Sequence, residues 1–172
     1  IQTNLRNGIT LDELEYILND SGASIAFVES SLQLDQIQQV KNSLETIVVM
    51  DEYFSPGGKN ISLAQVFRSG REILRDDPDS VRDAMGQVQD TDLATIIYTS
   101  GTTSEPKGVM LSNSNFMHQM RVIPKHIPSL NEEDRILSVL PPWHSFERSV
   151  EYVCLAIGAS MAYSQPYQKI LL

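Results

Sequence analysis

Residues 93–112 read LATIIYTSGTTSEPKGVMLS, in which an apolar run passes directly into small hydroxyl residues and glycine. The run at 93–98 has the length of a strand and is rich in β-branched side chains, so it predicts a buried β-strand. Residues 109–111 are apolar again and predict the next strand. The segment is therefore a strand, a loop and a second strand.

The loop between these strands has the composition of a phosphate-binding loop. Gly101 allows close approach of the backbone, and Lys107 adds a compact positive charge beside a stiffening Pro106. Gly108 is expected to let the chain turn back into the second strand. The spacing excludes a Walker A loop, which needs glycine directly before the lysine and serine or threonine directly after it. The hydroxyl donors of the loop are Thr99, Ser100, Thr102 and Thr103.

The rest of the chain alternates predicted helices and strands. Capping pairs start helices after Thr10 and Ser62, and caps at 112–115 start another. A helical face is predicted from Leu34 through Ile37 and Val40 to Leu44, and a helix at 146–157. Strand-like runs lie at 24–28, 47–50, 135–140 and 159–163, while 55–60 and most of 76–92 are expected to be irregular. This order predicts an α/β fold, with a mainly parallel sheet flanked by helices.

A second chemical segment, at 140–152, reads LPPWHSFERSVEY. Trp143 and His144 stand just before a predicted helix, at the carboxyl end of a strand, where open α/β sheets bind ligands. Taken alone, both could be scaffold residues, and Glu147 with Arg148 could be an ordinary solvated pair. His118 and His126 have no partners at metal-ligand spacing, so no metal site is predicted in this chain.

The ordered string from Tyr98 to Ser112 resembles the signature phosphate loop of the adenylate-forming, AMP-binding superfamily. The flanking strands at 92–97 and 109–112 extend that resemblance, and the segment around Trp143 and His144 looks most like long-chain acyl-CoA synthetases. Ser104 departs from the pattern, because the family usually has glycine there, and this bears on loop closure. By resemblance, the phosphate of ATP is contacted by Thr99, Ser100, Gly101, Thr102, Thr103 and Lys107.

The resemblance implies an activity and its substrates. ATP with Mg²⁺ and a fatty acid would give an acyl-adenylate, from which coenzyme A takes the acyl group. Trp143 and His144 would border the acyl substrate, with His144 in the catalytic role. Residues 1–172 would be part of the large N-terminal adenylation domain. The C-terminal domain that bears the catalytic lysine, and the residues for adenine, ribose and magnesium, would lie elsewhere, so this chain alone is expected to be inactive.

Composition narrows the partners and the compartment. The net charge of −9, from 13 basic and 22 acidic residues, argues against a nucleic-acid partner. Cys154 is the only cysteine, which favours a reducing, cytoplasmic compartment. No transmembrane segment or signal peptide is predicted, although peripheral contact with a membrane is compatible with a fatty substrate. The chain starts at Ile1 and stops in what resembles a first helical turn at 167–172, so a longer protein is expected.

Two alternative functions stay open at this stage. The first is a ligase of the same superfamily that loads acyl carrier protein or acts on another carboxylate. The second belongs to a different class: a phosphate- or nucleotide-binding fragment without catalysis.

Overall fold

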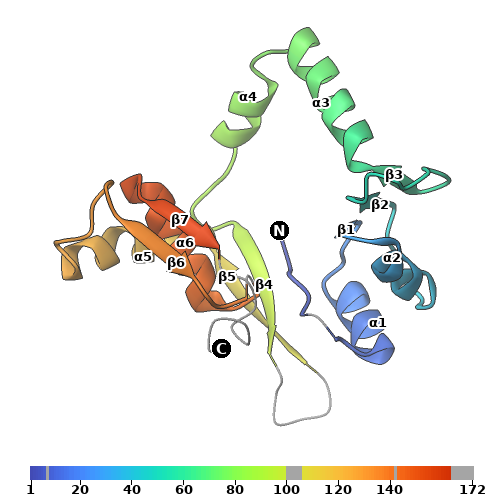
Figure 1. Ribbon diagram of the computed structural model, residues 1–172, viewed down its shortest axis with the longest axis horizontal. Helices are drawn as coiled ribbons and strands as arrows, with labels where there is room; N and C mark the ends of the chain where they lie inside the picture. The colour runs from blue at the N-terminus through green and yellow to red at the C-terminus, as the bar shows by residue number, and fades with distance from the viewer. Residues whose placement is uncertain (7, 100–105, 142, 164–172) are drawn as a thin grey trace. The chain divides into compact units, whose positions relative to one another are not determined.

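The computed structural model describes residues 1–172 except 7, 100–105, 142 and 164–172. The chain forms two compact units (Figure 1). Unit 1 comprises Ile1–Asn7 and Gln89–Leu172, and unit 2 comprises Gly8–Val88. The helix predicted to begin at 167–172 lies outside the described residues.

Unit 2 is built on a small parallel sheet with the strand order β1-β2-β3. The central strand β2 supplies the most deeply buried side chains, including Ile47 and Val49. Parallel strands buried in this way read as continuous apolar runs, which is why 47–50 was recognisable as a strand. Its elements are α1 Leu11–Asp20, β1 Ile25–Val28, α2 Ser31–Gln38, β2 Thr46–Val49, β3 Asn60–Ser62, α3 Leu63–Asp76 and α4 Ser80–Gly86.

Capping boxes fix where two helices of unit 2 begin, as predicted. The Thr10 hydroxyl accepts from the backbone N–H of Glu13 at 3.2 Å, and the Glu13 carboxylate accepts from the Thr10 N–H at 3.1 Å. Ser62 and Gln65 make the same reciprocal pair at the start of α3. Each box satisfies backbone donors that a helix leaves without partners at its first turn.

Unit 2 differs from the sequence-based expectation in three places. Helix α2 ends at Gln38, so Val40 and Leu44 lie beyond it, although both are buried. The segment 76–92, predicted mostly irregular, contains α4, at whose start Arg82 and Asp79 form an exposed ion pair of 2.7 Å. The three-residue strand β3 was not predicted, because it depends on pairing with β2 rather than on a long apolar run.

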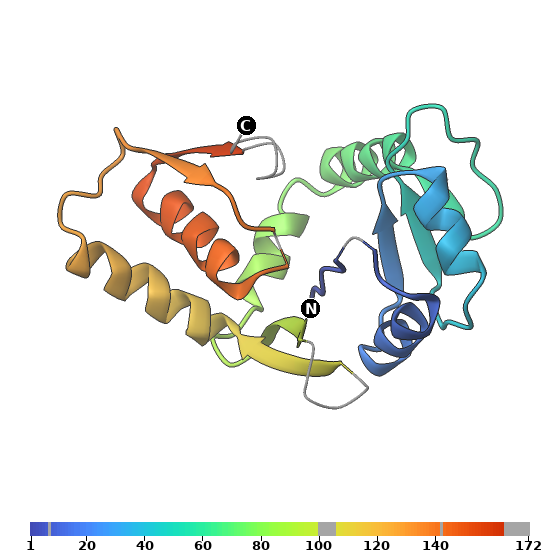
Figure 2. The ribbon, with the colours of Figure 1, turned by 60° about the horizontal axis from the view of Figure 1, so that its bottom comes forward.

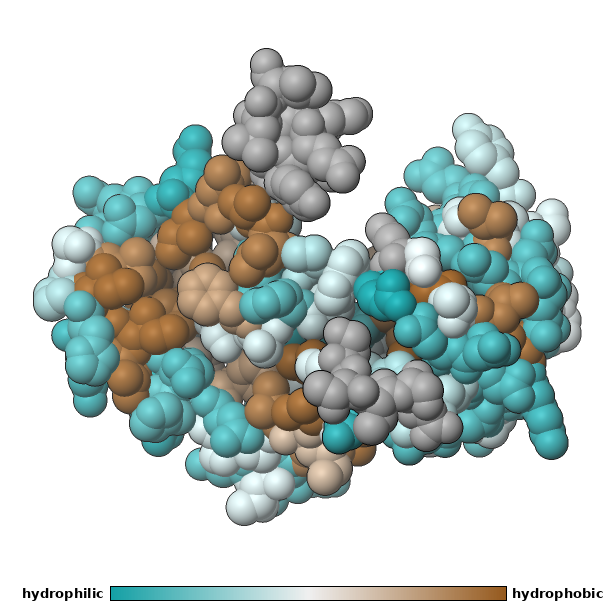
Figure 3. Space-filling model, turned by 90° about the horizontal axis from the view of Figure 1, so that it is seen from below, coloured by the Kyte–Doolittle hydropathy of each residue, from teal (hydrophilic) through white to brown (hydrophobic). Residues whose placement is uncertain are grey.

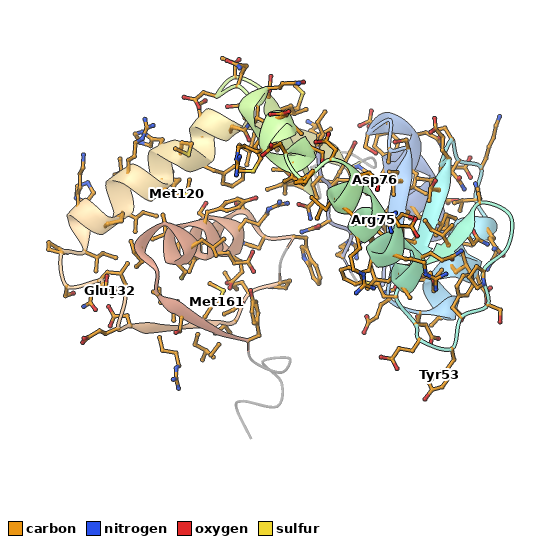
Figure 4. All side chains as sticks on the ribbon, turned by 90° about the horizontal axis from the view of Figure 1, so that it is seen from above. Tyr53, Arg75, Asp76, Met120, Glu132 and Met161 are labelled. Carbon is orange, nitrogen blue, oxygen red and sulfur yellow. The ribbon has the colours of Figure 1, made fainter. Side chains whose placement is uncertain are left out.

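Helices α3 and α4 expose much of their apolar surface within this chain. No residue of either helix is buried, and Phe67, Ile73 and Met85 are exposed. At the end of α3, Arg75 and Asp76 form an ion pair of 3.1 Å between two exposed side chains (Figure 4). Such a pair contributes little to stability, since water solvates both charges almost as well.

Unit 1 contains a β-hairpin and a parallel strand pair. Strands β4 and β5 are antiparallel, and the other edge of β4 is bridged by Gln2, whose N–H donates to Ala94 O at 3.1 Å. Helix α6 lies between α5 and the parallel β6–β7 pair (Figure 2). The elements are β4 Leu93–Thr99, β5 Lys107–Ser112, α5 Asn113–His126, β6 Arg135–Ser138, α6 Ser145–Ile157 and β7 Ser160–Tyr163.

The predicted α/β class is confirmed, and parallel pairing predominates. The exception is the β4–β5 hairpin, whose strands run antiparallel. Figure 3 shows a broad hydrophobic surface on unit 1. The exposed large apolar residues of unit 1 include Met110, Phe146 and Leu155. No helix in the described part of the chain is long and apolar enough to cross a bilayer.

Candidate functional site

The candidate phosphate loop is carried at the end of the β4–β5 hairpin. Thr99, the last residue of β4, stands directly opposite Lys107, the first residue of β5, and the Thr99 hydroxyl donates to the Lys107 carbonyl at a long 3.5 Å. Both side chains are exposed. The hairpin therefore holds a hydroxyl and an ammonium group at the two ends of the loop. The other predicted phosphate contacts, Ser100, Gly101, Thr102 and Thr103, lie outside the described residues.

The side chains at the loop end of the hairpin lie on the same face as a side chain that is buried in the interior of unit 1. Side chains alternate between faces along a strand, and directly opposed residues share a face. Thr99 and Lys107 are therefore on the same face as the pair Thr95 and Leu111, four residues farther from the loop. Thr95 is 0% exposed. The loop thus begins on a strand that is anchored in the interior.

Gly108 was predicted to form a turn that leads into the second strand. It lies instead within β5, where it pairs with Tyr98. A Cβ at Gly108 would lie 2.8 Å from the Ile96 methyl Cγ2 and 3.2 Å from the Tyr98 ring. The Gly108 backbone has no positive φ. Glycine is needed here for close packing of β4 against β5, which keeps the base of the loop compact.

His144 is the N-cap residue of α6. Its Nδ1 accepts from the backbone N–H of Phe146 at 3.2 Å, and its own backbone N–H donates to Pro141 O at 2.9 Å. A neutral imidazole whose Nδ1 accepts carries its proton on Nε2, as assigned from this hydrogen bond. The exposed ring can therefore offer Nε2–H as a donor to a ligand, while the ring orientation is fixed by the helix. Trp143, beside it, is half-buried.

Glu147 is buried, not solvated, with 4% of its surface exposed. Its Oε2 accepts from the backbone N–H of Leu140 at 3.2 Å, which fixes the start of the turn that contains Trp143 and His144. Its Oε1 is buried without a hydrogen-bond partner among the described residues. The carboxylate lies in the first turn of α6, where the helix dipole favours negative charge.

Arg148 is also buried, with 6% of its surface exposed. Its guanidinium donates to Thr95 Oγ1 at 3.1 Å, to Gln2 Oε1 at 2.7 Å and to the Tyr152 hydroxyl at 3.4 Å. The Tyr152 ring packs edge-on against Phe116 of α5, with a centroid distance of 4.9 Å. Arg148 therefore connects α6 with β4 and with the N-terminal segment of unit 1.

A mainly apolar pocket of about 350 Å³ lies between α5 and α6, and it includes Leu111 from the same face of the hairpin as Lys107. Ser145 and Phe146, which directly follow His144, line it, whereas neither Trp143 nor His144 does. Its volume is at the lower end of the range for small-molecule sites. The lining residues are Leu111, Asn115, Phe116, Gln119, Ile123, Ser145, Phe146 and Ser149.

Three further residues with potentially reactive side chains are Cys154, His118 and His126. Burial raises the pKa of the Cys154 thiol, and the Glu147 and Glu151 carboxylates add to this rise. The thiol therefore ionises less readily than a free cysteine and is a poor nucleophile. His118 and His126 are exposed on α5. The described residues contain no group of three or more His, Cys, Asp or Glu that could hold a metal ion.

Reasoning from the sequence missed the buried pair Glu147 and Arg148. One signal was present: Glu147 is two helical turns from Cys154, so the apolar face of α6 continues back to it. No comparable signal existed for the burial of Arg148, because two of its three acceptors, Thr95 and Gln2, lie 53 and 146 residues away.

Comparison with known proteins is consistent across sequence and structure. A family model described as AMP-binding enzyme matches residues 1–171. Long chain acyl-CoA synthetase 4 of Arabidopsis thaliana is 30% identical over 171 residues, which cover 94% of this chain. The chloroplastic long-chain-fatty-acid–[acyl-carrier-protein] ligase AEE15 of the same plant is 37% identical over 108 residues, which cover 60% of this chain. The crystal structure of a long-chain-fatty-acid-CoA ligase, FadD1, from Archaeoglobus fulgidus matches with a TM-score of 0.69 and 28% identity over 97% of this chain.

The chain spans only part of these proteins. It covers 25% of the length of the acyl-CoA synthetase, 14% of the carrier-protein ligase and 31% of the FadD1 chain.

Proposed function

The chain belongs to the AMP-binding enzyme family, and on that premise we propose that the whole protein joins a long-chain fatty acid to coenzyme A by way of an acyl-adenylate. In the first step a carboxylate oxygen of the fatty acid bonds to the α-phosphorus of ATP, and pyrophosphate leaves with the electrons of the broken P–O bond. In the second step the thiol of coenzyme A displaces AMP.

The observation that carries this proposal is the pairing of Thr99 with Lys107 at the loop end of the hairpin. The hairpin supplies a hydroxyl and a cation at the two ends of a sequence rich in further hydroxyls. A chain with a net charge of −9 must neutralise phosphate locally, and Lys107 is the cation within the loop sequence. We therefore assign ATP phosphate contacts to Thr99, Ser100, Gly101, Thr102, Thr103 and Lys107.

These residues act by positioning and by charge stabilisation. Lys107 and the hydroxyls of the loop hold the pyrophosphate group as its negative charge grows, which stabilises the transition state more than bound ATP. Mg²⁺, which ATP carries on its phosphates, would add to that neutralisation. Its protein ligands, like those of adenine and ribose, would belong to parts of the protein outside this chain.

His144 is proposed to act on the carboxylate. Because its Nδ1 is engaged by Phe146, its Nε2–H is the atom that can hydrogen-bond a carboxylate oxygen and orient it toward phosphorus. Ser145 and Phe146, which follow His144 in the sequence, line the mainly apolar pocket, and this supports that pocket as the place for the acyl chain. Trp143 is proposed to border the same substrate, so shortening it should alter the use of some chain lengths more than others.

Residues 1–172 are proposed to be part of an N-terminal adenylation domain, completed by a C-terminal domain that bears the catalytic lysine. The proposed compartment is the cytoplasm, with peripheral membrane contact as a route to fatty substrates.

The test is carboxylate-dependent pyrophosphate exchange by the whole protein, with fatty acids of increasing chain length. We expect long-chain fatty acids to support exchange, and residues 1–172 alone to support none. Exchange by these residues at a hundredth of the full rate would mean that the chemistry lies within them. A whole protein that exchanges pyrophosphate with no carboxylate would contradict the proposed function.

A second acceptor is favoured by one observation, the 37% identity to a carrier-protein ligase over 108 residues. In that case the acyl group would pass from the adenylate to the thiol of acyl carrier protein. Incubating the whole protein with ATP, a fatty acid, and either coenzyme A or acyl carrier protein separates the two, because only the true acceptor is acylated at an appreciable rate.

A further inference from the structure

Arg148 is held differently from the paired arginines of unit 2. Arg75 and Arg82 are exposed and each contacts a carboxylate, at 3.1 and 2.7 Å. Arg148 is buried, and its guanidinium contacts only neutral acceptors among the described residues. A buried charge that lacks a counter-charge opposes folding unless its hydrogen bonds compensate for the water it loses. A methionine of similar length would fill the same space without that cost, so packing alone does not account for an arginine here.

The acceptors of Arg148 are distributed over three segments of unit 1. Thr95 belongs to β4, Gln2 bridges the free edge of β4, and Tyr152 belongs to α6 itself. The Thr95 hydroxyl also donates to the Gln2 carbonyl at 2.5 Å. The guanidinium therefore closes a hydrogen-bonded network between α6 and β4, and its planar set of donors fixes direction as well as distance.

This hydrogen-bonded network joins the strand that carries the candidate phosphate loop to the helix that begins at His144. Along β4, Thr95 is followed after four residues by Thr99, where the phosphate loop begins. Along α6, the backbone N–H of Arg148 donates to the His144 carbonyl at 3.2 Å, so the same residue closes the helical turn that His144 caps. One residue thus holds β4 through its side chain and the His144 turn through its backbone.

We propose that Arg148 is a positioning residue that fixes His144 relative to the strand that carries the phosphate loop. This inference rests on the proposed function, since it assigns the phosphates to one part and the carboxylate to the other. Attack of a carboxylate on phosphorus requires that the two groups be held at the correct distance and orientation. A small displacement of either group reduces the rate strongly.

A matched pair of substitutions separates positioning from stability. Thr95→Val and Tyr152→Phe each remove one hydroxyl acceptor from the same guanidinium and keep the shape of the side chain. Only Thr95→Val removes the direct hydrogen bond from Arg148 to β4, together with the Thr95–Gln2 hydrogen bond, whereas Tyr152→Phe removes a contact within α6. Thr95→Ser restores the hydroxyl and is the conservative rescue. Arg148→Met removes all three hydrogen bonds of the guanidinium, keeps the backbone bond to His144, and serves as a second variant if Thr95→Val does not fold.

Pyrophosphate exchange by the whole protein is the first readout. We expect Thr95→Val to lower kcat by about tenfold or more, with the KM for fatty acid changed by less than about threefold. Arg148→Met should repeat this loss, and Tyr152→Phe and Thr95→Ser should stay close to wild type. Equal losses in Thr95→Val and Tyr152→Phe, or wild-type kcat in both Thr95→Val and Arg148→Met, would overturn the proposal.

Hydrogen exchange is the second readout and needs no activity. In Thr95→Val, amides of β4 and of the first turn of α6 should both exchange faster, whereas in Tyr152→Phe the change should stay within α6. Faster exchange in β4 alone would show that Arg148 does not couple the two segments. If wild-type protein shows no carboxylate-dependent pyrophosphate exchange, the proposed function fails, and hydrogen exchange alone decides whether Arg148 links β4 to α6.

Discussion

Units 1 and 2 bury different kinds of side chain. Among the described residues, the buried side chains of unit 2 are apolar, and its parallel strand β2 is the most completely covered element. Every buried polar or charged residue of the described chain lies in unit 1: Thr95, Ser138, Glu147 and Arg148. Apolar burial is the cheaper way to stabilise a fold, so the polar interior of unit 1 needs another explanation. Thr95 and Arg148 join β4 to α6, the elements that carry the proposed phosphate and carboxylate contacts. We therefore propose that unit 2 is a scaffold and that this part of the polar interior of unit 1 supports the site.

The largest expected effect tests the scaffold half of this comparison. Ile47→Ala in β2 should lower the free energy of unfolding of unit 2 by about 2–5 kcal/mol, because it leaves a cavity in a fully buried core. Ile25 in the neighbouring strand β1 is 55% exposed and is the matched control. Hydrogen exchange of β1 and β2 amides measures both variants. Comparable losses from Ile25→Ala and Ile47→Ala would contradict the assigned core.

Two glycines sharpen the comparison at the level of the backbone. Gly108→Ala in β5 should destabilise unit 1 by about 1–3 kcal/mol, because the new methyl group collides with Ile96 and Tyr98. Gly70→Ala in α3 has no atom within 4 Å of the new methyl group and should stabilise unit 2 by about 0.5–1 kcal/mol. Denaturant unfolding measures the change in the free energy of unfolding for each variant. A change of the same sign in both variants would contradict the close packing assigned to Gly108.

Two capping residues combine a small effect on stability with a functional contrast. Thr10→Ala in unit 2 and His144→Ala in unit 1 each remove a side-chain acceptor from a helix start, at a cost of about 1 kcal/mol. Only His144→Ala should also depress adenylate formation, and it should do so with fatty acids of every length. If both variants retained wild-type pyrophosphate exchange, His144 would be a cap and nothing more.

Local signals explain what could be predicted from the sequence. The Thr10–Glu13 and Ser62–Gln65 pairs mark helix starts by chemistry within four residues, and the structure confirms both. The strands β2 and β4 stood out because their apolar residues are consecutive. The loop between β4 and β5 was recognised from its order of residues, and its flanking strands are confirmed.

Features that depend on distant parts of the chain could not be predicted in the same way. The close packing at Gly108 requires knowing that Tyr98 and Ile96 lie across the hairpin, and β3 requires its partner β2. Arg148 is the clearest case, because nothing in the residues around it indicates that Gln2 and Thr95 will accept its hydrogen bonds. Helix α4 was missed because a polar segment gives little periodic signal even where it is helical.

The central claim, that unit 1 carries an ATP phosphate site around Lys107, is tested most directly by pyrophosphate exchange with Lys107→Ala in the whole protein. Lys125 on α5 is an exposed lysine of the same unit and provides the control, Lys125→Ala. Loss of one preorganised charge contact should cost about 2–4 kcal/mol of transition-state stabilisation, so exchange should fall by roughly 30- to 1000-fold in Lys107→Ala and stay near wild type in Lys125→Ala. Exchange by Lys107→Ala within about threefold of wild type, a difference of less than 1 kcal/mol, would contradict the claim.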